Sequence, residues 1–162
     1  MLTDYNLMPD SSRVWVYQSD RQFSENELET VKSKVEAFLN SWQRHGEDLK
    51  ASYIIAYNQF IVLLVDEAVN NVSGCSIDAS VNLMKQIENE FNVDLTNKLN
   101  VSFKDGDNIN IVKLSDFQSF AKESKITSKT IVFNNMVTTK SDFKSSWEVP
   151  LEKSWHKRFV AI

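Results

Sequence analysis

The chain has 162 residues, a net charge of −4 and an apolar fraction of 42%, a composition suited to one packed domain. Its longest uninterrupted apolar run, residues 60–65, is far too short to cross a bilayer, so we expect no membrane insertion. The first residues lack the basic and apolar segments of a secretory signal, and the single cysteine, Cys75, excludes a disulfide framework. We therefore expect a soluble, cytoplasmic protein.

The charged residues are distributed unevenly along the chain. Residues 1–81 carry 6 basic and 12 acidic side chains, whereas residues 82–162 carry 12 basic and 10 acidic ones. Nucleic-acid binding usually needs a strongly basic domain or stripe, and the second half is only mildly basic. We expect no nucleic-acid partner.

Three segments in the first half predict strands. The sequence RVWVYQ at residues 13–18 is rich in β-branched and aromatic side chains, and residues 51–57 and 60–65 form two further extended runs. Asn58 and Gln59 separate these two runs as a tight turn. The run at 60–65 does not alternate polar with apolar residues, which predicts a central strand buried on both faces.

A helix is predicted to follow the first strand. Ser24 and Glu27 have the spacing of a capping box, in which each side chain satisfies a free backbone N–H of the first turn. Apolar residues then recur three and four positions apart and define one buried face. We expect the helix to end at Gly46, with Arg44 and His45 in its last turn, where positive charge meets the negative end of the helix dipole.

The second half begins with a helix and a hairpin. Apolar residues predict an amphipathic helix from about Ile77 to Phe91. Residues 100–104 and 109–113 read as two strands that flank the turn sequence DGDN at residues 105–108.

The remaining residues give weaker signals. Ser115 is predicted to cap a short helix over residues 116–123, and residues 129–133 predict a strand. No period is evident in residues 134–162, which we expect to wrap the domain as ordered loop with a short terminal helix.

The order of the elements indicates an α+β fold in a single domain, residues 1–162. Strand, helix, strand, strand, helix and strand over residues 13–104 match the ferredoxin-like βαββαβ unit, in which two helices cover one face of a mainly antiparallel sheet. The first and third strands would lie in the middle of that sheet. Residues 105–162 would form an extension containing a hairpin, a helix and a strand.

This topology predicts which polar side chains lie near one another. The end of the third strand, the start of the second helix and the end of the first helix fall on one edge of the sheet. Asp66, Glu67, Cys75 and His45 could therefore be neighbours, with Lys104 nearby if the fourth strand runs parallel to the third.

Cys75 has two alternative interpretations. A helix N-terminus stabilises a thiolate, so Cys75 could be a nucleophile with His45 as its base and Asp66 orienting the imidazole. In the other interpretation Cys75 is a small, buried and inert residue, and Ser76 caps the helix.

The same helix start could bind an anion. Free backbone N–H groups after Gly74, together with the hydroxyls of Ser73 and Ser76, could hold a phosphate or a carboxylate within the segment that ends at Asp78.

Metal and nucleotide sites are not indicated. Two distant histidines and one cysteine give no zinc-binding spacing, so we expect no metal. The only glycines, Gly46, Gly74 and Gly106, are too few and too far apart for a P-loop or a Rossmann turn. We expect no cofactor.

Several strings resemble a family of short proteins from Bacteroidetes-type bacteria. They include SRVWVYQSDR, FIVLLVDE, SGCSIDAS, VSFKDGD, TIVFNN and SWHKRF, and the resemblance runs from about Leu2 to Phe159. Members of that family carry the label "ABC transporter ATPase", and the resemblance brings no established catalytic residues. The chain lacks the P-loop that such an ATPase requires.

The function that we expect from the sequence is a binding module. Its partner would be a small anionic ligand, held near Gly74–Asp78, or another protein. The alternative is a thiol-dependent enzyme that uses Cys75 as nucleophile and His45 as base. Oligomeric state is not indicated by the sequence.

Overall fold

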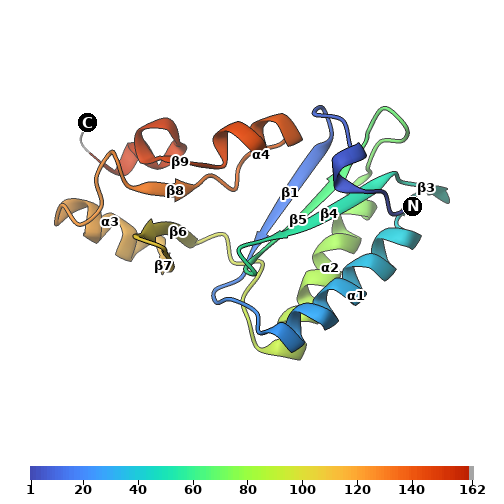
Figure 1. Ribbon diagram of the computed structural model, residues 1–162, viewed down its shortest axis with the longest axis horizontal. Helices are drawn as coiled ribbons and strands as arrows, with labels where there is room; N and C mark the ends of the chain where they lie inside the picture. The colour runs from blue at the N-terminus through green and yellow to red at the C-terminus, as the bar shows by residue number, and fades with distance from the viewer. Residues whose placement is uncertain (161–162) are drawn as a thin grey trace. The chain divides into compact units, whose positions relative to one another are not determined.

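The computed structural model describes residues 1–160 and divides the chain into two compact units (Figure 1). The first unit contains residues 1–96 with residues 138–141, and the second contains residues 97–137 with the residues from 142 onward. Each unit has a sheet of antiparallel strands and at least one helix, so the α+β class is confirmed.

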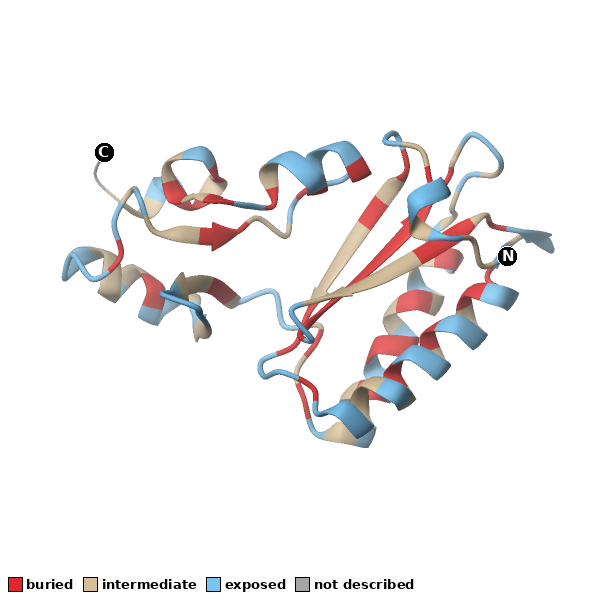
Figure 2. Ribbon diagram, in the orientation of Figure 1, coloured by how far each residue is buried: buried red, intermediate tan, exposed pale blue. Residues whose placement is uncertain are grey.

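The sheet of the first unit has three strands in the order β1-β5-β4. They are β1 (Arg13–Gln18), β4 (Ala51–Ala56) and β5 (Phe60–Val65), and both pairings are antiparallel. Every residue of β5 is buried (Figure 2), which explains why its sequence is apolar throughout. A central position for this strand is the outcome that its sequence predicted.

Two helices, α1 (Glu25–Ser41) and α2 (Gly74–Phe91), lie side by side on one face of this sheet (Figure 1). The capping box at the start of α1 is present: the Ser24 hydroxyl accepts from the backbone N–H of Glu27, and the Glu27 carboxylate accepts from that of Ser24. The core between the helices and the sheet is largely aliphatic; its members include Val31, Val35, Leu39, Ile61, Leu63, Val65, Leu83, Met84 and Ile87.

The predicted end of the first helix is wrong. The helix stops at Ser41, and the next residues form a hairpin of β2 (Gln43–Arg44) and β3 (Glu47–Asp48). His45 and Gly46 occupy the two-residue turn with φ angles of 51° and 81°. Such turns suit the right-handed twist of paired strands and require positive φ, which glycine adopts without strain. Gly46 therefore closes a turn rather than a helix.

The two edges of the first sheet, β1 and β4, are partly covered by segments that are distant in the sequence or at its start. Residues 138–140 lie beside the start of β1, where Val14 N–H donates to the Thr138 carbonyl over 3.0 Å. The ammonium group of Lys140 is buried, donates to the carbonyls of Tyr5 and Met8, and lies 4.4 Å from the Tyr5 ring centroid. At the other edge, residues 1–3 lie beside Ala51 of β4.

The second unit has a four-stranded sheet in the order β7-β6-β8-β9. Its strands are β6 (Asn100–Asp105), β7 (Asn108–Lys113), β8 (Ile131–Phe133) and β9 (Glu148–Pro150). Gly106, with φ 62°, begins the turn between β6 and β7, as the turn sequence predicted.

The position of β6 corrects the predicted ferredoxin-like sheet. We expected residues 100–104 to be the fourth strand beside β1, but β6 pairs with β7 and β8 instead. The first unit thus has the expected order of three strands, and β1 lies at an edge rather than in the middle. A strand's sequence specifies its buried face but not which strand it will pair with, so the local pattern could not reveal this.

Helix α3 (Leu114–Lys122) follows β7 directly. Its N-cap is Lys113, without a side-chain cap, so the predicted Ser115 cap is wrong. Phe117 of this helix is buried in a second core with the aliphatic side chains of Val101, Ile126, Val132 and Leu151. Partly buried rings packed against that core include Phe103, Phe120, Trp155 and Phe159.

Residues 134–160 contain more regular structure than we expected. They form α4 (Lys140–Ser146), β9 and two short 3₁₀ helices, Leu151–Lys153 and Trp155–Phe159. The last of these corresponds to the predicted short terminal helix. A further 3₁₀ turn, Tyr5–Leu7, lies near the beginning of the chain.

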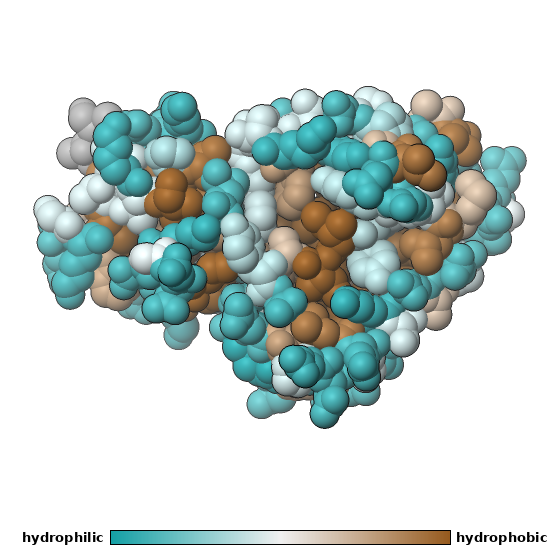
Figure 3. All heavy atoms as spheres, in the orientation of Figure 1, coloured by the Kyte–Doolittle hydropathy of each residue, from teal (hydrophilic) through white to brown (hydrophobic). Residues whose placement is uncertain are grey.

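Hydrophilic residues cover most of the visible surface, with smaller apolar patches between them (Figure 3). Among the helices described, none combines the length and the apolar character needed to cross a membrane.

Candidate functional site

The start of α2 is built by two serines. The hydroxyl of Ser73, the N-cap, accepts from the backbone N–H of Ser76 over 3.2 Å, and the two serine hydroxyls lie 2.9 Å apart. The Ser76 hydroxyl donates to the carbonyl of Gln43 over 2.9 Å. The helix thus begins three residues earlier than predicted and is capped by Ser73 rather than Ser76. Both hydroxyls already have partners within the protein, which leaves them less available to a ligand.

The two residues that follow the cap are open to solvent. Gly74 and Cys75 are both exposed, so the interpretation of Cys75 as a buried residue is wrong. Within residues 1–160, no hydrogen bond reaches the backbone N–H of either residue. Unpaired N–H groups at a helix start attract anions. Asp78, also exposed, lies one turn further along and adds negative charge.

His45, the predicted base, lies in the turn of the β2–β3 hairpin and not in the last turn of α1. It is exposed at the tip of the β2–β3 hairpin, because α1 ends before it. In the described part of the chain, no hydrogen bond joins His45 to Cys75 or to Asp66. A nucleophile and its base must come within hydrogen-bond reach, and this pair does not do so here.

Asp66 and Glu67 have structural partners. The buried Asp66 carboxylate accepts from the backbone N–H of Ala68 over 3.1 Å, and its other oxygen lies 3.6 Å from the ammonium of Lys50. Glu67 accepts from the N–H of Val72 over 3.4 Å. The two carboxylates therefore shape the loop between β5 and α2.

Two further expectations concern charge and metal binding. Lys104, expected near this edge, belongs to β6 in the second unit, where its ammonium group lies 3.0 Å from the Glu148 carboxylate. Among residues 1–160, no three His, Cys, Asp or Glu side chains are grouped as a metal site would need.

Trp42 fixes the end of α1 against the start of α2. Its indole N–H donates to the carbonyl of Ser76 over 2.8 Å in a buried position. Its ring lies 5.9 Å from that of Trp15 and 5.1 Å from that of Phe38. The prediction that these two helix ends lie together is confirmed, although the connecting residues are a strand and not a helical turn.

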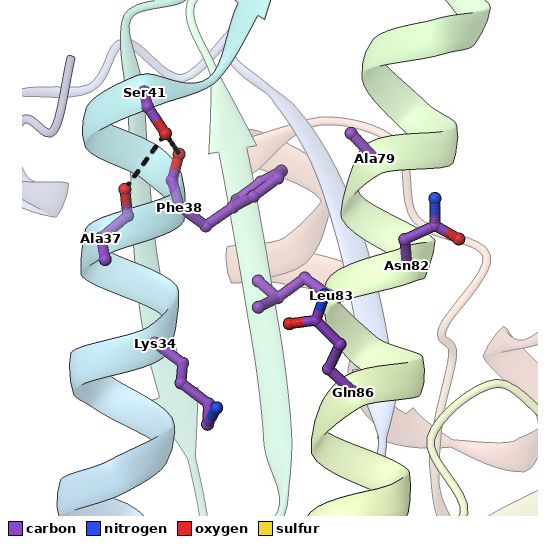
Figure 4. Close-up of a pocket in the computed structure, with 8 residues that line it drawn as sticks. All are labelled: Lys34, Ala37, Phe38, Ser41, Ala79, Asn82, Leu83 and Gln86. Carbon is purple, nitrogen blue, oxygen red and sulfur yellow. Dashed lines mark hydrogen bonds between the residues drawn. The ribbon is translucent and has the colours of Figure 1, made fainter.

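A groove runs between the outer surfaces of α1 and α2 (Figure 4). It has a volume of about 500 Å³. The half-buried Phe38 and the buried Leu83 point toward one another from the two helices. The lining residues of α1 are Lys34, Ala37, Phe38 and Ser41, and those of α2 are Ala79, Asn82, Leu83 and Gln86.

The chemistry of the groove is an apolar floor with a polar, nearly neutral rim. The Ser41 hydroxyl is hydrogen-bonded to the carbonyls of Ala37 and Phe38 over 3.3 Å each (Figure 4), so it adds little unpaired polarity. The lining lysine, Lys34, is paired with Glu90 of α2 over 3.0 Å. The amides of α2 retain donors and acceptors for a ligand.

Cys75 belongs to the same side of α2 as the groove. Residues three and four apart share one helix face, and Cys75, Ala79, Asn82 and Gln86 follow that spacing. The exposed thiol therefore lies one turn from the end of the groove. The local sequence pattern indicates Cys75 but not the groove, because the two walls of the groove come from helices whose relative rotation no local pattern reveals.

Two polar groups beneath this site were also missed. The Tyr17 hydroxyl, hydrogen-bonded to Ser80 of α2 over 2.9 Å, has a pKa raised above its ordinary value by burial. The Arg44 Nε atom is buried and has no hydrogen-bond partner within residues 1–160. Arg44 is two residues from Trp42 on the same extended segment, and alternate residues of a strand share a face, which places it on the side that meets α2.

Comparison of the chain with protein-family models, with curated proteins and with solved structures finds no significant match.

Proposed function

We propose that this protein is a cytoplasmic binding module whose partner, a segment of another protein, binds in the groove between α1 and α2. The observation that carries the proposal is the pairing of an apolar floor, Phe38 and Leu83, with the amide side chains of Asn82 and Gln86. Apolar pockets with a few polar groups are the usual form of binding sites.

The shape of the groove suits a side chain carried by a helix or an extended segment. Small residues at its rim, Ala37, Ser41 and Ala79, would let the backbone of a partner approach closely. In the first unit, α1 and α2 pack on the sheet through one side and leave the other side free (Figure 1). An apolar anchor could enter between Phe38 and Leu83 while the amides bond its backbone.

Cys75 gives a direct test of this proposal. Fragments that carry a disulfide exchange with an exposed thiol and stay attached only if they also bind nearby. We expect apolar fragments to be retained at Cys75 under mildly reducing conditions, and Ala79→Arg to release them by filling the groove. Ser33→Arg places the same side chain at an exposed position of α1 outside the groove and should leave retention unchanged. Equal loss in both variants, or no retention, would contradict the proposal.

A small anionic ligand at the start of α2 is the second candidate. The unpaired N–H groups of Gly74 and Cys75 favour it, and Arg44 would supply the counter-charge. The same experiment separates the two sites, because carboxylate or phosphonate fragments bound at the helix start would be retained in Ala79→Arg. Arg44→Gln should weaken that retention, whereas it should not affect apolar fragments in the groove.

The thiol-dependent enzyme is less well supported, and its test is separate. An activated Cys75 assisted by His45 would be alkylated by iodoacetamide rapidly at pH 6 and more slowly in His45→Gln. We expect instead the same rate in His45→Gln as in the wild-type chain. Rapid, His45-dependent alkylation would favour the enzyme.

A further inference from the structure

The outer edges of the three-stranded and four-stranded sheets differ in how they are protected. Edge strands present unpaired N–H and C=O groups to other chains, and proteins usually cover or shorten them. Residues 138–140 cover the start of β1, residues 1–3 cover the start of β4, and β9 has only three residues and ends in Pro150. The fourth edge, β7, has six residues and no proline.

The hydrogen-bond pattern shows which groups of β7 face outward. Leu114 N–H donates to the Leu99 carbonyl, and opposed residues of an antiparallel ladder alternate between hydrogen-bonded and non-hydrogen-bonded pairs. Counting back from Leu114, the residues of β7 that bond to β6 are Asn108, Asn110 and Val112. The backbone groups of Ile109 and Ile111 point to the opposite side. Within residues 1–160, no hydrogen bond reaches them there.

The side chains of β7 make it complementary to a second copy of itself. Ile109 and Ile111 share one face and are half-buried. Asp107, before the strand, and Lys113, at its end, are exposed and carry opposite charges, and neither forms an ion pair with another described residue. In an antiparallel pair of two such strands, the acidic end of each lies beside the basic end of the other.

We propose that β7 pairs antiparallel with β7 of a second copy of this chain. The two-fold axis would pass beside Asn110, placing Ile109 opposite Ile111 of the other copy and Asp107 beside its Lys113. In this register the backbone groups of Ile109 and Ile111 that face outward bond to one another across the axis. Two four-stranded sheets would then join into one continuous sheet, with an isologous interface. The inference does not depend on the helical groove of the first unit.

A single substitution can block the pairing without disturbing β6. Proline lacks an N–H, and the N–H of Ile111 points away from β6, so Ile111→Pro keeps the β6–β7 ladder and removes only an outer donor. We expect concentration-dependent dimerisation of the wild-type chain in sedimentation velocity, and its loss in Ile111→Pro. Ile55→Pro makes the same change at an outward-facing position of β4 and should leave the dimer intact.

The charged ends test the register. Asp107→Lys and Lys113→Asp should each weaken the dimer about tenfold, since two symmetry-related pairs become repulsive, and the double exchange should restore it. Asn110→Cys, in a Cys75→Ser background, should form an intermolecular disulfide. The two copies of residue 110 would face each other as a non-hydrogen-bonded pair, whose Cα atoms lie about 4.5 Å apart. A chain that remains monomeric at all concentrations would overturn the proposal and leave this edge to a peptide of another protein. A dimer insensitive to these changes would overturn it equally.

Discussion

The two units build their hydrophobic cores from different kinds of elements. The first unit packs two long helices on a three-stranded sheet, whereas the second packs short elements on a smaller core in which Phe117 contacts the rings of Phe103, His156 and Phe159. Their charges also differ: the first unit carries 8 basic and 15 acidic residues, net −7, and the second carries 10 and 7, net +3. Apolar residues can therefore be buried either by long periodic helices or by short elements packed around a central ring.

Substitutions at the two core centres should separate the units most clearly. Phe117→Ala should destabilise the second unit by about 3–5 kcal/mol, because it removes a fully buried ring. Leu39→Ala is the matched change in the first unit and should cost about 2–5 kcal/mol there. Hydrogen exchange measured by mass spectrometry should show faster exchange mainly in the substituted unit. Equal acceleration throughout the chain would mean that the two cores unfold as one.

The buried His156 should also make the second unit sensitive to acid. Burial lowers the pKa of His156 from 6.5 to about 4, and its Nδ1 atom lies 2.7 Å from the Ser154 hydroxyl. The unfolded chain therefore takes up a proton near pH 6.5, before the folded chain does, and stability falls as the pH falls through this window. The expected loss between pH 7 and pH 5 is about 2 kcal/mol, measurable by urea unfolding at the two pH values.

The two histidines provide the comparison for this pH effect. His156→Phe should reduce the loss between pH 7 and pH 5, because a phenyl ring can stack on Trp155 without titrating. His45→Gln changes the exposed histidine of the first unit and should retain the wild-type loss. The pKa of Glu27 is held at about 2 by its hydrogen bonds with Arg21, so this carboxylate stays ionised in the folded chain throughout the window. An unchanged loss in His156→Phe would rule out His156 as its source.

The smallest effect concerns the hairpin that replaces the end of the predicted helix. Gly46→Ala should cost about 1 kcal/mol, because Gly46 has a φ of 81° that alanine adopts with strain. Gly74→Ala is the control in the same unit: its φ is not positive, and an added Cβ would meet no atom within 4 Å. Thermal unfolding should therefore show a lower midpoint only for the first variant. A similar decrease in both would indicate that the turn conformation is not the cause.

The sequence predicted the elements whose signals are local. The capping box at Ser24, the apolar run of β5 and the turn beginning at Gly106 each depend on neighbours in the chain, and all three are present. The pairing of β6 with β8 and the regular structure after residue 134 depend on distant partners, which no local pattern contains. The hairpin turn at His45 and Gly46 could have been suspected, because a glycine after a residue that tolerates positive φ suits a two-residue turn.

The candidate site likewise has features that the sequence could predict and features that it could not. The sequence placed Cys75 at a helix start but favoured a buried cysteine, as is usual for this residue type, whereas the structure exposes it. The groove with Phe38 and Leu83 depends on how two helices are rotated against one another, and it required the structure. The predicted position of His45 was wrong because we extended the first helix to the nearest glycine, Gly46, whereas α1 ends at Ser41.

The buried ammonium of Lys140 has a consequence for the order of biosynthesis. Lys140 and its neighbours complete the first unit, yet they are 135 residues from Tyr5, to which Lys140 donates. A chain growing on the ribosome must therefore expose β1 with one edge uncovered while most of the second unit is still being made. Contacts of such long sequence separation form late and slowly. The edge of β1 in the nascent first unit would thus stay uncovered until residue 141 has emerged.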